Sequence, residues 1–359
     1  MKQELLSQTE AAARAAYAAR VQSVPHFPAP LSAPIGTHFS ALAQPSADYY
    51  EVESQSAALS AAMGSVAAGK RTFLPMSIPH VMQDFWAASA LRLPVVAANV
   101  SRVPGLFSVA SDHNDVLGLR DAGWLVFAAA GSQEVLDSII QAYRVCEDQR
   151  VLLPAVVNID GIANWREPVT VPSEQSVAKL LPAPKVRWDG KRQSVYAEHD
   201  YVETRMQQQR AMSQALKALE MVHEDWKKRF KQDYGLVEKY RLDDAETVLV
   251  MAGFHTATAK AAVDALREKG EKVGLLRLRV LRPFPAHDIR ESLSVAKKIG
   301  VLDQNISVGH AGILHTEVQA ALCRPCSGFI MLGKHPAQRD ISDVFGHLKK
   351  SEKDERIWL

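Results

Sequence analysis

The apolar residues of this chain fall into short runs separated by amphipathic stretches, and this alternation predicts the elements of the fold. Runs with the length of a buried strand occur at residues 93–99, 123–128, 151–160, 247–252, 273–280 and 298–303. Between them, residues 133–143 and the stretch from Gly253 to Lys269 have helical spacing, and Gly270 is placed to cap the second helix. Strands alternating with helices indicate an α/β fold with a mostly parallel sheet.

The remaining segments have a different character. Residues 3–24 are rich in alanine and predict a helix, the prolines from Pro25 to Pro34 then favour an extended loop, and the small residues 56–68 predict a closely packed helix. Residues 163–194 lack periodicity and are expected to form a connector or surface arm. Residues 201–231 predict a long charged helix that packs across a partner or between domains, or else forms a solvated linker.

These patterns divide the chain into four parts. Residues 1–162 form a first α/β domain, 163–240 a connector arm with the long helix, 241–347 a second α/β domain, and 348–359 a C-terminal tail. A chain of 359 residues is long enough for two such domains.

Composition excludes several classes of function. The formal net charge is only +2 and the sequence has no block of basic residues, which argues against a nucleic-acid partner. No apolar run approaches the roughly 18 residues of a membrane span. The first residues lack the apolar core of a signal peptide, so a cytoplasmic protein is the simplest expectation.

The three cysteines cannot supply a conventional four-thiolate iron–sulfur site. Cys323 and Cys326 have the spacing of a redox pair, but they lack a second pair or a nearby histidine. We therefore favour two incidental, partly buried thiols over a redox or metal site. Any cluster that works with this chain is expected on another chain.

Several motifs occur in a characteristic order. The segment from Glu51 to Gly64 continues to Gly69-Lys-Arg-Thr-Phe73; it is followed by Asp112-His-Asn-Asp115, Arg120-Asp-Ala-Gly-Trp124 and Glu147-Asp-x-Arg-Val-Leu-Leu-Pro154. Phe230-x-x-Asp-Tyr-Gly-Leu-Val-Glu238 and Leu281-Arg-Pro-Phe-Pro285 follow in the second half. In this order, the motifs resemble the α subunit of the 2-oxoacid:ferredoxin oxidoreductases, the family of pyruvate:ferredoxin oxidoreductase or pyruvate synthase, over residues from about 10 to 345.

The resemblance implies a fold and a set of partners. The first domain would be of the thiamine-diphosphate (ThDP) pyrimidine-binding type, and the second would be like the C-terminal domain of transketolase. A β subunit would bind the diphosphate and magnesium and carry a 4Fe–4S cluster, while γ and ferredoxin-like δ subunits would supply the coenzyme A site and further clusters. The reaction would be oxidative decarboxylation of a 2-oxoacid to its acyl-CoA, or the reverse, with electrons passing to ferredoxin.

The resemblance also implies a cofactor-binding residue that differs here. Where the family motif has the glutamate that holds the aminopyrimidine, this chain has Gln55. Glutamine can form hydrogen bonds but cannot carry a proton, and losing a positioned proton-transfer group lowers a rate by roughly 10²–10⁴-fold. Glu53 shares a face with Gln55 if this segment is extended, but not if it is helical. Rescue by Glu53 is therefore the less favoured alternative.

Further departures affect the residues that the resemblance places near cofactor and substrate. Pro28 lies in the expected cofactor loop, and Pro30 replaces a threonine that faces the substrate. Ser77 and His80 belong to a loop after residues 71–73 that has gained prolines.

Two segments contain candidates for substrate binding. Val100 stands where the family has an arginine that pairs with the substrate carboxylate, and Arg102 lies two residues on. A guanidinium fork matches a carboxylate, although Arg102 as a surface loop residue is equally compatible. Asp112, His113 and Asp115 either form a site near the substrate or, as the alternative, cap a helix with polar surface neighbours.

Two hypotheses explain why the departures cluster in the contact residues. In the first, the chain works within a complex on an unusual 2-oxoacid, with Arg102, His80 or His113 reshaping the pocket. In the second, it keeps the α-subunit fold as a scaffold or regulatory member without activating ThDP. Arg102 favours the first hypothesis, whereas Gln55 and Pro30 favour the second.

Overall fold

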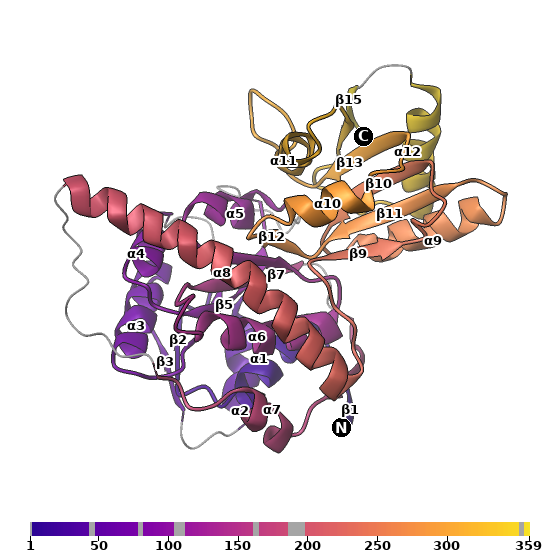
Figure 1. Ribbon diagram of the computed structural model, residues 1–359. Coiled ribbons are helices and arrows are strands. Elements are labelled where there is room, and N and C mark those ends of the chain that lie inside the picture. Colours follow the sequence, from indigo (N-terminus) through magenta and orange to yellow (C-terminus); the bar gives the residue numbers. More distant parts are fainter. Residues whose placement is uncertain are drawn as a thin grey trace.

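The computed structural model describes residues 2–42, 47–77, 82–103, 112–160, 165–185, 198–351 and 355–359 (Figure 1). It consists of two α/β halves, the first drawn in indigo to violet and the second in orange to yellow. His80, one of the expected site residues, lies outside the described residues.

The first half is built on a five-stranded sheet in the order β12-β6-β7-β5-β4. Four of these strands are parallel and come from the first half of the chain: β4 (Phe73–Met76), β5 (Val96–Ser101), β6 (Leu125–Ala128) and β7 (Ala155–Asp160). Beside it, β2 (Ser23–His26) and β3 (Asp48–Glu51) pair in parallel, and a bridge between Ser23 and Thr72 connects β2 to the start of β4.

The second half is built on a six-stranded sheet in the order β15-β14-β13-β10-β11-β9. Its strands are β9 (Val237–Tyr240), β10 (Thr247–Ala252), β11 (Val273–Leu278), β13 (Lys298–Asp303), β14 (Ser327–Ile330) and β15 (Arg356–Trp358). All pairs in this sheet are parallel except β11 with β9. The predicted α/β class with mostly parallel strands is confirmed.

Helices cover both sheets. In the first half they are α1 (Gln8–Ala18), α2 (Ala33–Ala41), α3 (Gln55–Ala67), α4 (Met82–Ala90), α5 (Asn114–Leu117), α6 (Ser132–Cys146) and α7 (Glu174–Leu180). The long α8 (Glu198–Phe230) leads to α9 (Thr256–Arg267), α10 (Ala286–Ser292), α11 (Ile313–Leu322) and α12 (Gln338–Lys350).

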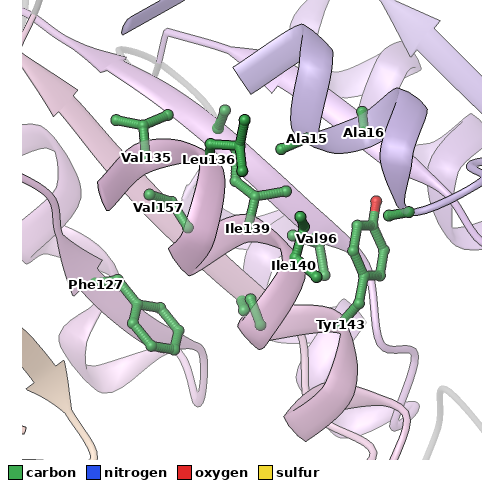
Figure 2. Close-up of a cluster of buried hydrophobic side chains, with 14 of the residues drawn as sticks. Ala15, Ala16, Val96, Phe127, Val135, Leu136, Ile139, Ile140, Tyr143 and Val157 are labelled. Atoms are coloured by element: carbon green, nitrogen blue, oxygen red, sulfur yellow. The ribbon is translucent and has the colours of Figure 1, made fainter. Parts of the chain in front are cut away.

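Successive residues of the central strands point to opposite sides of the first sheet and so build two cores. Val157 packs on the side covered by α1 and α6, whereas the adjacent Val156 belongs to a core that continues into the second half. Figure 2 shows Leu136 and Ile139 of α6 between the sheet and Ala15 of α1. Burying each of these aliphatic side chains contributes about 1.5–3 kcal/mol. The second core joins the two halves into one packed body.

The structure differs from the sequence expectations at both ends of the chain. A helix was expected over residues 3–24, but it extends only from Gln8 to Ala18, because β1 (Lys2–Leu6) pairs with β8 (Glu167–Val171) and residues 23–26 form β2. The expected tail, residues 348–359, contains the end of α12 and the edge strand β15. Pairing between segments distant in sequence overrides local propensity in each case.

The expected connector also carries regular structure. Within residues 163–194, β8 and α7 form, and α8 follows along the first half (Figure 1). The apolar face of α8, with Ala215, Leu219 and Trp226, is buried in the core next to α6. This burial contradicts a purely solvated linker helix.

A buried ionic cluster joins the two halves. Glu134 of α6 accepts hydrogen bonds from Arg277 of β11 at 2.8 and 3.1 Å and from Arg279 at 2.6 Å. Arg279, which is 1% exposed, also donates to Ser138 and Gln141 of α6. Burial raises the pKa of Glu134, but the two guanidinium charges outweigh this effect and hold it below its usual value.

The residues after Arg279 then enter the first sheet. β12 (Val280–Arg282) pairs antiparallel with β6 and forms the edge of the five-stranded sheet. Leu281 and Arg282, the first two residues of the motif Leu281-Arg-Pro-Phe-Pro285, therefore lie in the first sheet, although the motif belongs to the second half of the sequence.

Removing the charge of Glu134 leaves two buried guanidinium groups without full compensation. We expect Glu134→Gln to lower the free energy of unfolding by about 3–5 kcal/mol. Glu238→Gln is the matched control, because its carboxylate also pairs with Arg277 but its side chain is 34% exposed; it should cost at most about 1 kcal/mol. Urea unfolding of the purified chain measures both, and equal losses would contradict the assigned role of Glu134.

Candidate functional site

The candidate site lies at the carboxyl ends of the parallel strands of the first half. In the register of the sheet, Met76 of β4 is opposite Asn99 of β5, and Ser101 of β5 is opposite Asp160 of β7. The residues that follow these strands therefore share one edge, where open α/β sheets bind ligands.

Gln55 is the first residue of α3 and is 7% exposed. Ser54 caps the helix by accepting a hydrogen bond from the backbone N–H of Ala57, so the Gln55 side chain has no capping role. Its amide oxygen and nitrogen are both buried, and neither has a hydrogen-bond partner among the described residues. Because such groups are costly to leave unsatisfied, Gln55 is suited to a ligand that both donates and accepts.

Glu53 lies in the turn before α3 and is exposed. Glu53 is exposed whereas Gln55 is buried, and this difference does not favour rescue of Gln55 by Glu53. Pro28 and Pro30 follow β2 and are also exposed, while Ala29 between them is buried.

Ser77 follows β4 directly and is buried. Its hydroxyl donates to the backbone carbonyl of Val100 at 2.9 Å, which ties the end of β4 to the end of β5. Ser77 therefore has a structural contact in this chain.

Arg102 follows β5 and is half-buried. The Nε atom of its side chain is buried and has no hydrogen-bond partner among the described residues. An unsatisfied guanidinium donor at a strand end is suited to an anionic group. This geometry agrees better with a ligand-binding arginine than with an arginine in a solvated loop.

A buried polar network lies next to Arg102. Asp115, which is 4% exposed, accepts hydrogen bonds from the Asn99 amide at 2.9 Å, the Ser101 hydroxyl at 2.8 Å and the backbone N–H of Arg102 at 3.2 Å. The Asn99 amide also donates to Asn158 of β7 at 2.8 Å. The network holds the ends of β5 and β7 in one arrangement.

Residues 112–115 are wedged between the two halves of the molecule. The backbone N–H of His113 donates to the carbonyl of Gln304 at 2.9 Å, and Asn114 exchanges two side-chain hydrogen bonds with the backbone of Ile306, each 2.7 Å. Asp112 accepts the backbone N–H of Asn114 at 2.5 Å, but it precedes the N-cap residue of α5, His113, whose side chain makes no capping hydrogen bond. Asp112, His113 and Asp115 are buried at this interface and Asn114 is half-buried, which contradicts the surface position expected by the helix-capping alternative.

His113 is buried against Asp160 and Gly253. Its Nε2 lies 3.6 Å from a carboxylate oxygen of Asp160. A Cβ placed on Gly253, where φ is +78°, would lie 2.8 Å from the His113 ring. The strand-to-helix turn after β10 thus contacts His113 through a glycine that leaves room for the ring.

Burial and charge shift the pKa values in this region. Burial lowers the pKa of His113, but the Asp160 carboxylate, aided by Asp115 and Asp112, outweighs it and raises the pKa above its usual value. Burial raises the pKa of Asp115 to about 6, although its hydrogen bonds act in the opposite direction. Burial also lowers the pKa of His255, beyond Gly253, to about 4. Ionisable groups with shifted pKa values are common at functional sites.

The sequence analysis did not identify several members of the buried polar network around Asp115. Asn99 and Asn158 each interrupt an apolar strand, and a polar residue at a buried strand position is a signal that could have identified them. The loop containing Gln304 and Ile306 carries no such signal, because its backbone rather than its side chains makes the contacts.

Other classes of site find no support in the described part of the chain. No group of three or more histidine, cysteine or acidic residues there is arranged to hold a metal ion. Cys323 is exposed, Cys326 is buried, and neither forms a disulfide. Among the described helices, none combines the length and apolarity needed to cross a bilayer.

The fold is that of a two-domain α/β protein, and its candidate site lies at the carboxyl ends of the parallel strands of the first sheet. Its structure is similar to a 2-oxoglutarate:ferredoxin oxidoreductase from Magnetococcus marinus, solved with 2-oxoglutarate, coenzyme A and succinyl-CoA bound (TM-score 0.76, 12% identity, 96% of this chain and 65% of the longer chain). It is also similar to a split-gene transketolase (TM-score 0.60, 13% identity, 97% of this chain and 99% of that chain).

Sequence comparison defines the family. The model of the pyruvate flavodoxin/ferredoxin oxidoreductase thiamine-diphosphate-binding domain matches residues 14–234, and that of the pyruvate:ferredoxin oxidoreductase core domain II matches residues 245–341. The chain belongs to this family and is an α subunit of a 2-oxoacid:ferredoxin oxidoreductase. The predicted family and the predicted identity as its α subunit are confirmed.

Named relatives cover nearly the whole chain. Pyruvate synthase subunit PorA of Methanocaldococcus jannaschii is 37% identical over 99% of this chain and 97% of its own length. The PorA of Methanothermobacter thermautotrophicus is also 37% identical, over 91% of this chain and 90% of its own. Ketoisovalerate oxidoreductase subunit VorA of Pyrococcus abyssi is 34% identical over 95% and 91%.

The contact between His113 and Gly253 can be tested by adding one methyl group. We expect Gly253→Ala to destabilise the chain by at least about 1 kcal/mol more than Gly270→Ala, because a Cβ at an unsuitable φ strains both but overpacks only the first. Gly270 is the matched control, since its φ of +82° is similar and no heavy atom lies within 4 Å of its added Cβ. Thermal or urea unfolding measures the difference; identical losses would contradict close packing of the His113 ring.

Proposed function

We propose that this chain holds the aminopyrimidine of ThDP with the side-chain amide of Gln55 and completes a 2-oxoacid site only with a partner subunit. The observation that carries the proposal is the pair of buried Gln55 amide atoms without a hydrogen-bond partner among the described residues. An aminopyrimidine has both donor and acceptor groups, which a carboxamide can match. ThDP supplies the carbon nucleophile for 2-oxoacid decarboxylation when it is bound.

The Gln55 amide binds and orients the pyrimidine but leaves its proton equilibrium largely to the cofactor, because a carboxamide does not titrate. Glu53 is exposed and has no part in this contact. Pro28 and Ser77 border the cofactor, with the Ser77 hydroxyl holding the end of β5 in place. We retain His80 as a cofactor contact on the family resemblance alone.

Arg102 is proposed to bind the carboxylate of the 2-oxoacid through its buried guanidinium edge. Pro30 is proposed to border the substrate, while Asp112 and His113 support this side of the pocket from the interface between the two halves. The relatives named for pyruvate and ketoisovalerate, and the structural neighbour with 2-oxoglutarate bound, support a 2-oxoacid as the substrate class.

The remaining functions belong to other chains. We propose a β subunit that binds the diphosphate and magnesium and carries a 4Fe–4S cluster, γ and ferredoxin-like δ subunits, and ferredoxin as the electron acceptor. The names of the relatives, which are subunits, support a multisubunit complex. The complex is proposed to be cytoplasmic.

Replacing Gln55 tests the cofactor contact directly. We expect Gln55→Leu to raise the dissociation constant for ThDP in the assembled complex by about 10- to 100-fold, since two hydrogen bonds of about 0.5–1.5 kcal/mol each are lost. Calorimetric titration of the cofactor-stripped complex measures the constant. Glu53→Gln is the matched control and should leave it unchanged. Loss of binding in the Glu53 variant alone would reverse the assignment of the two residues.

Cofactor content distinguishes an active subunit from a scaffold. We expect the complex purified with its natural partners to contain about one ThDP per α/β pair, measured by mass spectrometry after denaturation, because one shared site is made by each pair. The isolated chain should oxidise no 2-oxoacid. An intact complex with its clusters but no ThDP would favour the scaffold hypothesis, and activity of the isolated chain would contradict the shared site.

A further inference from the structure

The carboxylate of Asp115, in the first turn of α5, accepts four hydrogen bonds. Its Oδ1 accepts the Ser101 hydroxyl at 2.8 Å and the backbone N–H of Val116 at 2.6 Å. Its Oδ2 accepts the Asn99 amide at 2.9 Å and the backbone N–H of Arg102 at 3.2 Å. Three of the four donors belong to the last residues of β5 or to the residue that follows it.

The position of Asp115 is fixed from the opposite side. The two preceding residues are held by the second half of the molecule, since the His113 backbone donates to Gln304 and the Asn114 side chain bonds the backbone of Ile306. Asp115 is therefore held in place by the second half of the molecule, and its carboxylate in turn fixes the end of β5. A functional group held by such a supporting contact is placed more accurately than one on an unsupported loop.

The residue at the end of this chain of contacts is Arg102. Its backbone N–H is held by Asp115, whereas the Nε atom of its side chain has no hydrogen-bond partner among the described residues. The backbone of Arg102 is thus fixed while part of its guanidinium group remains available for a ligand. Fixing the base of a flexible side chain reduces the entropy lost when its tip binds.

We propose that Asp115 is a positioning residue for substrate recognition: it anchors the backbone of Arg102 so that the guanidinium group meets the carboxylate of the 2-oxoacid. The inference rests on the proposed function, in which Arg102 binds that carboxylate. Asp115 itself touches neither substrate nor cofactor. Replacing Asp115 should therefore weaken substrate binding. This effect should disappear when residue 102 no longer carries a guanidinium group that can form two hydrogen bonds to the carboxylate.

The experiment is a double-mutant cycle in the assembled complex, with Asp115→Asn, Arg102→Lys and the double variant. The substrate is whichever of pyruvate, 2-oxoisovalerate and 2-oxoglutarate the complex uses with the highest kcat/KM. We expect Asp115→Asn to raise KM about tenfold with kcat changed less than about twofold. In the Arg102→Lys background, the same substitution should raise KM by less than about twofold, because residues that act together are not additive.

Two further variants separate positioning from loss of structure. Asp137→Asn is the matched control: Asp137 is also a buried aspartate, but it accepts hydrogen bonds from Tyr234 and Gln133, on the side of the sheet covered by α6. It should leave KM unchanged. If Asp115→Asn does not fold, Ser101→Ala removes one donor to Asp115 and should raise KM in the same direction by a smaller factor.

The outcomes distinguish the inference from the function on which it rests. If Arg102→Lys leaves KM unchanged, the proposed role of Arg102 fails and the positioning role fails with it. If Arg102→Lys raises KM but Asp115→Asn lowers only kcat, or acts to its full extent in the Arg102→Lys background, the positioning role alone is overturned. A KM effect of Asp115→Asn that requires Arg102 supports it.

Discussion

The arrangement of the two halves depends on one buried carboxylate. Glu134 lies between Arg277 and Arg279; Arg277 also pairs with Glu238, whereas Glu134 is the only carboxylate that pairs with Arg279 among the described residues. Because both arginines flank the end of β11, their pairing with α6 directs the chain into β12 and onto the edge of the first sheet. The carboxyl ends of the two sheets then meet at residues 112–115, where the candidate site is supported. An interaction far from the chemistry thus determines whether the site is assembled.

The candidate site combines a neutral side-chain amide with charged supporting groups. Gln55 offers a carboxamide where the family motif has a carboxylate, and the acidic groups of this region, Asp115 and Asp160, lie instead at the ends of α5 and β7. Their charges stabilise His113 and the end of β5 rather than Gln55. Departures in the residues that we propose to contact ligands therefore coexist with an intact polar framework. This combination agrees with a family member whose pocket has been reshaped while its frame persists.

Much of the fold could be predicted from the sequence, because apolar runs as short as 247–252 and 298–303 favour a buried strand over a helix. The sequence analysis missed the strands β1 and β15. Both are short and form by pairing with partners distant in sequence, which no local pattern encodes. At the candidate site, motifs singled out Gln55 and Arg102 as candidates, but the link from Arg102 through Asp115 to Gln304 could not be predicted. It depends on backbone groups, and these are the same in every sequence.

The position of β12 also bears on how the gene for this chain can evolve. A strand encoded after residue 279 completes a sheet whose other strands all precede residue 161. The boundary that separates the two halves in sequence therefore does not separate them as folding units. A fragment ending before β12 would expose the edge of β6, a row of unsatisfied peptide groups that invites association with other strands. Fission or recombination of the gene between the halves is disfavoured for this reason, and the two domains are expected to be inherited together.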